Sequence, residues 1–207
     1  NDRRSALNPV PPRTDGRAVL AAAFCGVAVT MNVGKVPIAM DELRGEFGLS
    51  LVAAGWISSM VNLIGVCAAL LFGLFGDRLG ALRLCFAGLV LSLSGGLGAL
   101  FAAGQWPLLL SRFAEGAGLV AVAVSAPALL SAASSPQDRR FALGIWCGYL
   151  PAGVGSVMLL APLVMPLGGW RALWLLTLGM LLAATAALWR ARAAYRSAAP
   201  AGRDPHP

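Results

Sequence analysis

Charged side chains are scarce in this sequence. Only 12% of the 207 residues are charged, whereas an ordinary soluble domain has about 25%. There is a single lysine, so the net charge of +7 comes from arginine. With 58% hydrophobic residues, the composition excludes an ordinary soluble domain and predicts an integral membrane protein. The spread of the arginines along the chain favours membrane topology over nucleic-acid binding, so we expect no nucleic-acid partner.

Residues that bind metals or attack substrates are also few. The single histidine, His206, lies near the C-terminal end. Four cysteines lie within apolar stretches without metal-ligand spacing, which is typical of small core residues: Cys25, Cys67, Cys85 and Cys147. The sequence shows no nucleophile paired with a base and no phosphate-binding loop between a strand and a helix. We therefore expect no enzymatic activity, no metal and no cofactor.

Long apolar runs divide the chain into six segments of membrane-crossing length. About 20 helical residues cross the hydrocarbon core of a bilayer, and we expect an all-α protein with six transmembrane helices. These helices should cover residues 18–40, 51–75, 84–103, 107–132, 141–164 and 170–189. Residues 1–17 should form a cytoplasmic leader, and residues 190–207 a cytoplasmic tail or central linker.

The arginines predict the orientation of these helices, because cytoplasmic loops carry the excess of basic residues. One side of the six-helix arrangement has only Arg44 and Arg171. The other side has twelve arginines, at positions 3, 4, 13, 17, 78, 83, 139, 140, 190, 192, 196 and 203. We therefore expect both termini in the cytoplasm.

A short charged segment between the second and third expected helices carries the most compact pattern of the chain. Glycines at positions 73, 76 and 80 permit a sharp reversal, and Asp77 adjoins Arg78. From its composition alone, this segment can be interpreted as a positively charged cytoplasmic turn. The pattern also resembles the Gly-x-x-x-Asp-Arg-x-Gly loop between helices 2 and 3 of the major facilitator superfamily, with Gly73, Asp77, Arg78 and Gly80 at the matching positions.

The match to that loop is incomplete. Ala81 and Leu82 occupy the positions where the family has a basic pair, and Arg83 is the nearest cation. The resemblance implies that the charged residues of this segment, Asp77, Arg78 and Arg83, close a cytoplasmic gate, with Gly73 and Gly80 shaping the turn.

Charged residues within the expected helices are the strongest functional candidates, because each costs a few kcal/mol inside a bilayer. Lys35 lies three residues after Asn32, and Glu115 lies three residues after Arg112, so each pair shares one helix face. The two helices run in opposite directions, which allows a cluster of Lys35 with Glu115 and of Asn32 with Arg112. Two alternatives remain open: Lys35 reaches the headgroups, or Arg112 and Glu115 only neutralise each other.

Further residues support the same resemblance. Arg112 and Gly116 match the Arg-x-x-x-Gly motif of helix 4 in the superfamily, which implies substrate binding or proton transfer by Arg112 and Glu115. The Gly169-Trp170-Arg171 segment is similar to the entry of helix 6, with the tryptophan as an interfacial anchor. Asn62 and Tyr149 are candidates to line a cavity or to make a helix–helix hydrogen bond.

The fifth expected helix is rich in glycine, with Gly144, Gly148, Gly153 and Gly155. Close helix packing explains this run, and Pro151 allows a bend.

Taken together, the resemblance implies the N-terminal half of a secondary transporter, built from three plus three helices in inverted relation. Such a half would move a small, anionic or polar solute by alternating access in a bacterial inner membrane, with Glu115 as the candidate for proton coupling. It would need a second six-helix half, from the same polypeptide, a second copy or a separate chain. The alternative function is a membrane scaffold that does not transport and uses the same half-fold to bind a partner.

Overall fold

The computed structural model describes residues 14–197, except for the side chains of residue 62, residues 66–78 and residues 196–197. Within that part of the chain the regular elements are helices. They are α1 (Gly16–Phe47), α2 (Leu51–Leu79), α3 (Ala81–Leu100), α4 (Gln105–Ala133), α5 (Arg139–Cys147) and α6 (Tyr149–Ser197). The protein is therefore all-helical where it is described, as the composition predicts.

α1 is longer than the sequence predicts. At its N-terminus, the Asp15 side chain accepts hydrogen bonds from the backbone N–H groups of Arg17 and Ala18, at 3.0 and 3.1 Å. At its other end Gly48 adopts a left-handed conformation with φ of 61°, and its N–H bonds to the carbonyl of Arg44. The prediction of a loop over residues 41–50 is thus wrong for residues 41–47, which are helical because the C-cap of α1 lies at Gly48.

The connection between α2 and α3 is also shorter than expected. Both helices continue into the charged segment, and Gly80 alone, with φ of 80°, separates them. A positive φ carries no steric penalty in glycine, so one residue suffices for the turn. The expected loop over residues 76–83 is therefore mostly helical, and α3 begins at Ala81 and ends at Leu100 instead of covering residues 84–103.

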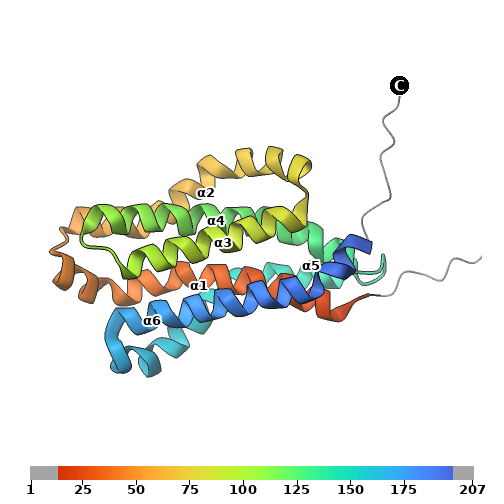
Figure 1. The fold of residues 1–207 in the computed structure, drawn as a ribbon. Helices are drawn as coiled ribbons and strands as arrows, with labels where there is room; N and C mark the ends of the chain where they lie inside the picture. Colours follow the sequence, from red (N-terminus) through yellow and green to blue (C-terminus); the bar gives the residue numbers. More distant parts are fainter. Residues whose placement is uncertain (1–13, 198–207) are drawn as a thin grey trace, which may run out of the picture.

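The last third of the chain departs most from the expected boundaries. The expected helix over residues 141–164 is interrupted at Gly148, whose N–H turns back to the carbonyls of Ile145 and Trp146. α6 then consists of two helical segments joined at Gly168 and Gly169, where the backbone is not helical. Figure 1 shows the two segments of α6 folding back beside each other, and the second runs to Ser197, beyond the expected residue 189.

α1 lies at the centre of the bundle. It packs along both segments of α6 and against α4, while α3 packs along α4. The largest core cluster joins α1, α3, α4 and α6 through buried residues such as Cys25, Cys85, Leu130 and Leu181. Two of the cysteines are thus core residues, as expected, whereas Cys147 is exposed and Cys67 lies outside the described side chains.

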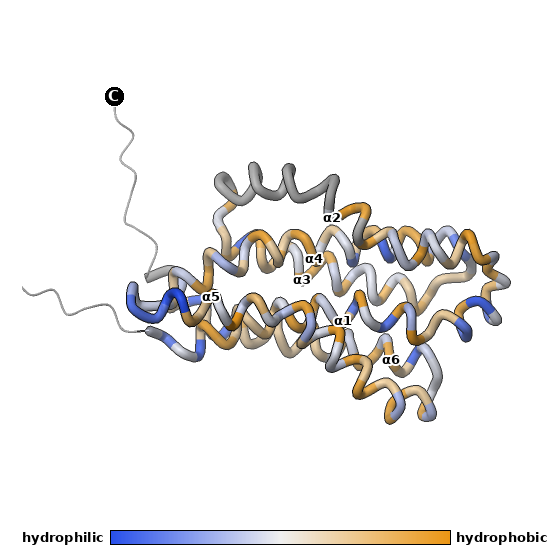
Figure 2. Tube along the Cα trace, turned by 180° about the vertical axis from the view of Figure 1, so that it is seen from behind, coloured by the Kyte–Doolittle hydropathy of each residue, from blue (hydrophilic) through white to orange (hydrophobic). Residues whose placement is uncertain are grey.

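The start of α1 and the end of α6 lie at the same end of the bundle, beside α5 (Figure 1). Hydrophilic residues gather at this end in Figure 2, while apolar residues dominate along the helices. In the described part of the chain, four helices are long and apolar enough to cross a membrane: α1, α3, α4 and the 47 residues Tyr149–Tyr195 of α6. Large apolar side chains such as Phe101, Leu159 and Leu167 are exposed on the outside, as suits contact with lipid.

Candidate functional site

α1 and α4 bring together the four polar residues that the sequence singles out within its apolar runs. Lys35 Nζ donates to Asn32 Oδ1 at 2.7 Å and to Glu115 Oε1 at 2.9 Å. Arg112 donates from one terminal nitrogen to the backbone carbonyl of Asn32 at 3.1 Å, and it forms an ion pair with Glu115. Glu115 therefore lies between two cations, one from each helix.

The whole cluster is sealed from solvent. The side chains of Lys35, Arg112 and Glu115 have no accessible surface, and Asn32 is 2% exposed. Lys35 therefore does not reach toward the headgroups, which rules out that alternative for this conformation. Arg112 and Glu115 do form an ion pair within one helix. Lys35 of α1 also pairs with Glu115, so the two α4 residues do not only neutralise each other.

α6 adds two residues to the cluster that the sequence interpretation missed. Thr177 Oγ1 accepts a hydrogen bond from Lys35 Nζ at 3.2 Å and donates to the carbonyl of Trp174 at 2.9 Å. The Trp174 ring lies 4.3 Å from Lys35 Nζ and 5.5 Å from the Arg112 guanidinium, within range of cation–π attraction. Trp174 and Thr177 are three residues apart in the sequence and therefore share one face of an apolar helix. This spacing is the feature by which the sequence could have identified them.

Several polar atoms of the cluster lack partners in the described part of the chain. They include Asn32 Nδ2, Arg112 Nε and Trp174 Nε1, all of which are buried. Buried donors without acceptors are energetically unfavourable. This arrangement can accept a further ligand that offers oxygen atoms, provided that the helices separate enough to admit it.

The backbone of α3 lies directly against the cluster. A side-chain carbon at Gly95 would lie 2.8 Å from Glu115 Cγ, and one at Gly96 would lie 3.3 Å from Glu115 Oε1. These two glycines therefore let α3 approach Glu115 closely. Ser111, one turn before Glu115, donates to the carbonyl of Leu108 at 2.7 Å and so stays within its own helix.

Two other candidates have different positions. Tyr149 stacks on Trp146 with ring centres 4.1 Å apart, and its backbone carbonyl accepts a hydrogen bond from Thr30. It thus helps to pack α6 against α1 and does not join the charged cluster. Asn62 lies in α2, outside the described side chains, so its role stays a prediction.

The expected gate residues are only partly described. Gly80 makes the turn between α2 and α3, and Arg83 is exposed near the start of α3. Gly73, Asp77 and Arg78 lie outside the described side chains. The gating role of this segment therefore stays a prediction.

The end of the bundle opposite α5 has a polar junction between α1 and the break in α6. The backbone N–H of Trp170 donates to Glu42 at 2.6 Å, and its indole N–H donates to Glu46 at 2.7 Å. Arg171 also pairs with Glu46. Trp170 is only 2% exposed, so its interpretation as an interfacial anchor is wrong: it joins α1 to α6 inside the protein.

No group of three histidine, cysteine or acidic residues in the described part of the chain is arranged to hold a metal ion. The side chains of the charged cluster themselves offer charge pairing, hydrogen bonding and proton transfer.

The fold and the sequence together decide the family. The family model described as Major Facilitator Superfamily matches residues 22–206. The chain belongs to the Major Facilitator Superfamily. The crystal structure of peptide transporter POT (E310Q mutant) in complex with sulfate has the same fold, with a TM-score of 0.75 and 18% identity, over 94% of this chain and 42% of that one.

Sequence relatives are also transporters. NiaP of Bacillus subtilis (strain 168), which is named as a niacin/nicotinamide transporter, is 34% identical over 154 residues, or 71% of this chain. The arabinose-proton symporter of Escherichia coli (strain K12) is 26% identical over 173 residues, or 82% of this chain. The present chain covers 37% of the length of each of these two relatives. The predictions of a major-facilitator protein, of a membrane protein and of a protein that is not an enzyme are therefore confirmed.

Proposed function

We propose that this chain is one half of a secondary active transporter that moves a small anionic or polar solute by alternating access. The observation that carries the proposal is the sealed cluster in which two cations, Lys35 and Arg112, share the single acid Glu115. Ionisable groups buried among apolar helices usually serve a transported ion or solute. The niacin and sugar transporters among the relatives support the same general function.

The charge balance of the cluster suggests how solute and proton are coupled. With Glu115 ionised, the three side chains carry a net charge of +1. If Glu115 takes a proton and the site takes an anionic solute, the net charge is again +1. Loading both ligands thus leaves the buried charge unchanged, whereas either ligand alone changes it. This balance favours joint movement of a proton and an anion.

The proposal includes six membrane spans with both termini in the cytoplasm. In this proposal the two segments of α6 would make two of the crossings, and the arginine distribution supports the orientation. A membrane-impermeant thiol reagent tests this topology in a variant without native cysteines. A cysteine at Gly45 should react from outside intact bacterial cells, and one at Arg139 should not. The opposite labelling would contradict the proposed orientation.

A complete transporter also needs a second half, because alternating access places the solute between two repeats that move against each other. Native mass spectrometry of the complex purified in mild detergent tests this requirement. We expect a homodimer, a pair with a second six-helix chain, or a longer polypeptide that contains this sequence. A stable single six-helix chain would contradict the two-half mechanism and would favour the scaffold alternative.

The preference for an anion is tested with nicotinate and nicotinamide, which differ in charge but little in shape. We expect nicotinate to raise the thermal stability of the purified complex more than nicotinamide does. Lys35→Met and Arg112→Met should abolish this difference, and Arg171→Gln, which removes an exposed cation elsewhere, should preserve it. An equal response to both compounds in the unmodified protein would contradict an anionic site for this solute class.

A further inference from the structure

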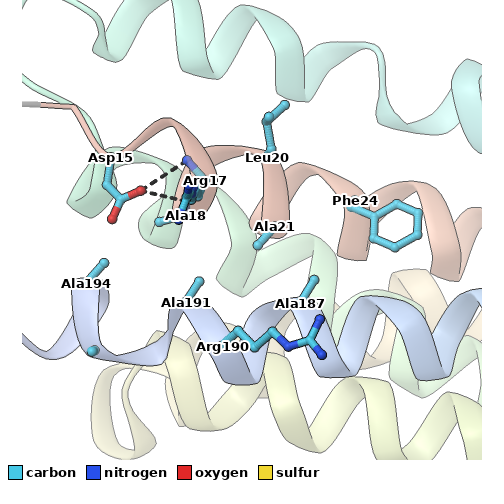
Figure 3. Close-up of a pocket in the computed structure, with 11 residues that line it drawn as sticks. Asp15, Arg17, Ala18, Leu20, Ala21, Phe24, Ala187, Arg190, Ala191 and Ala194 are labelled. Carbon is cyan, nitrogen blue, oxygen red and sulfur yellow. Dashed lines mark hydrogen bonds between the residues drawn. The ribbon is translucent and has the colours of Figure 1, made fainter.

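A groove between α1 and the C-terminal segment of α6 lies at the end of the bundle that carries both termini. Its volume is about 680 Å³. Figure 3 shows Ala187, Ala191 and Ala194 projecting from α6 toward α1. These alanines recur at intervals of four and three residues, so they share one helix face. Their small side chains line the groove on the α6 side.

α1 contributes Leu20, Ala21 and Phe24 to the lining, and in Figure 3 Ala21 points toward α6, whereas Leu20 points away from it. Leu20 is 64% exposed, although it belongs to an apolar helix. The buried hydroxyl of Tyr195 donates to the carbonyl of Ala18 and so joins α6 to α1 beside the groove. The groove is therefore a formed feature of the packed helices.

Two arginines line this groove. Arg17 comes from the first turn of α1, and Arg190 comes from α6, where its side chain runs along the helix toward Ala187 (Figure 3). Both are exposed, and the ion pairs of the described residues involve neither of them. Among the described residues, Asp15 is the only acid in the lining, and one of its oxygens already caps α1. The lining thus has two cations against one acid.

Trp189 indicates the depth of this end in the membrane. Trp189 is 58% exposed, and the Arg192 guanidinium lies 3.7 Å from its ring centre. An exposed tryptophan beside arginine at the end of an apolar helix is typical of the membrane–water interface. Because Arg190 follows Trp189 directly, we place Arg190 at the depth of the lipid headgroups.

We propose that the groove binds an anionic phospholipid. Its headgroup would lie over the groove, where Arg17 and Arg190 supply positive charge, and an acyl chain would run along the apolar lining of Ala21, Phe24 and the three alanines. The combination of two arginines and an apolar lining fits a lipid better than a free phosphate, which would leave the lining uncovered. The groove is separate from the charged cluster, since Arg17 and Lys35 are 18 residues apart, or about 27 Å along α1.

Native mass spectrometry of the full chain in detergent tests this site. The probes are phosphatidylglycerol, phosphatidylcholine and inorganic phosphate. We expect phosphatidylglycerol to remain bound, and the double variant Arg17→Gln/Arg190→Gln to lower its affinity roughly tenfold. The matched control is Arg139→Gln/Arg140→Gln, which removes the same charge at the same end without touching the groove and should bind as the unmodified protein does.

Three outcomes would overturn the proposal. They are equal binding of the two lipids, unchanged affinity in the Arg17→Gln/Arg190→Gln variant, and displacement of the lipid by millimolar phosphate alone. A second measurement does not depend on the stability of that variant. A photo-crosslinking amino acid in place of Ala191 should attach to phosphatidylglycerol. Attachment to residues 1–13, to residues 198–207 or to another protein chain would show that the groove has a different occupant.

Discussion

Lys35 and Glu115 are 80 residues apart in the sequence, yet the lysine donates to the carboxylate at 2.9 Å inside a sealed helical bundle. Both residues lie in the middle of long apolar helices, where neither charge is stable alone. The pair therefore joins α1 to α4, and it can open only if another charge or a proton replaces the lost partner.

Glu115→Gln should destabilise the protein by about 3 kcal/mol, because two buried cations lose their shared carboxylate. Thermal unfolding in detergent measures the change. Combining it with Lys35→Met should restore part of the loss, since the net charge of the cluster returns to +1. The control Glu46→Gln breaks a partly exposed ion pair with Arg171 and should cost less than about 1 kcal/mol. Equal stability of Glu115→Gln and the unmodified protein would disprove the coupling.

Proton-driven uptake should also depend on Glu115. If this carboxyl carries the proton, Glu115→Gln should abolish accumulation of solute against its gradient in proteoliposomes, while exchange of solute across the membrane continues. Accumulation at the normal level in this variant would assign the proton to a different group.

Thr177→Val should weaken the cluster without changing its charge, because it removes the α6 oxygen that accepts from Lys35. We expect a loss of about 1–2 kcal/mol in the free energy of unfolding. Thr185→Val is a matched control on the same helix, since the one hydrogen bond of Thr185 within the described part of the chain goes to the carbonyl of Leu181 in its own helix. If both substitutions have the same effect, the bond between Thr177 and Lys35 adds nothing.

Gly153→Ala and Gly155→Ala should differ sharply in stability although they lie two residues apart. A side-chain carbon at Gly153 would lie 1.9 Å from Thr30 Oγ1 and 2.5 Å from the Val27 carbonyl, whereas nothing lies within 4 Å of one at Gly155. We expect Gly153→Ala to cost about 1–3 kcal/mol through overpacking. Gly155→Ala should be neutral or should stabilise the helix slightly. Similar melting temperatures for the two variants would contradict the packing of α6 against α1.

Asp138 gives a prediction for pH. Hydrogen bonds from Thr14, and then from Ser135, lower the pKa of this exposed carboxyl below its ordinary value. Its stabilising contribution is therefore fully present above that ordinary value and is lost as the pH falls through the lower pKa of the folded protein. Exchange of the Asp15 amide, which bonds to the Ala133 carbonyl nearby, reports on this contact.

Protection of that amide should persist at pH 5 and decline only in stronger acid. Asp138→Asn should reduce it at neutral pH as well, since an amide oxygen is a weaker acceptor than a carboxylate. Protection that is unaffected by Asp138→Asn would mean that this contact does not hold the start of α1.

The sequence by itself determined the class of the protein and its strongest candidates. Apolar runs of membrane-crossing length predicted helices, because a backbone in lipid must satisfy its own hydrogen bonds. The isolated charges at Lys35, Arg112 and Glu115 were identifiable because such groups are unfavourable among apolar residues, and the spacing of three placed each polar pair on one helix face.

Tertiary structure decided which faces meet. Helical periodicity gives a polar face but does not say which neighbour covers it, so Thr177 and Trp174 of α6 could not be assigned to the cluster in advance. In the same way, glycines that look equivalent in sequence differ in the structure: Gly153 contacts α1, and Gly155 does not. Helix ends also depended on the local backbone at Gly48 and Gly80, where a positive φ ended a helix regardless of the surrounding charge. Contacts between distant segments follow from close packing of whole helices, and a single linear pattern does not contain that information.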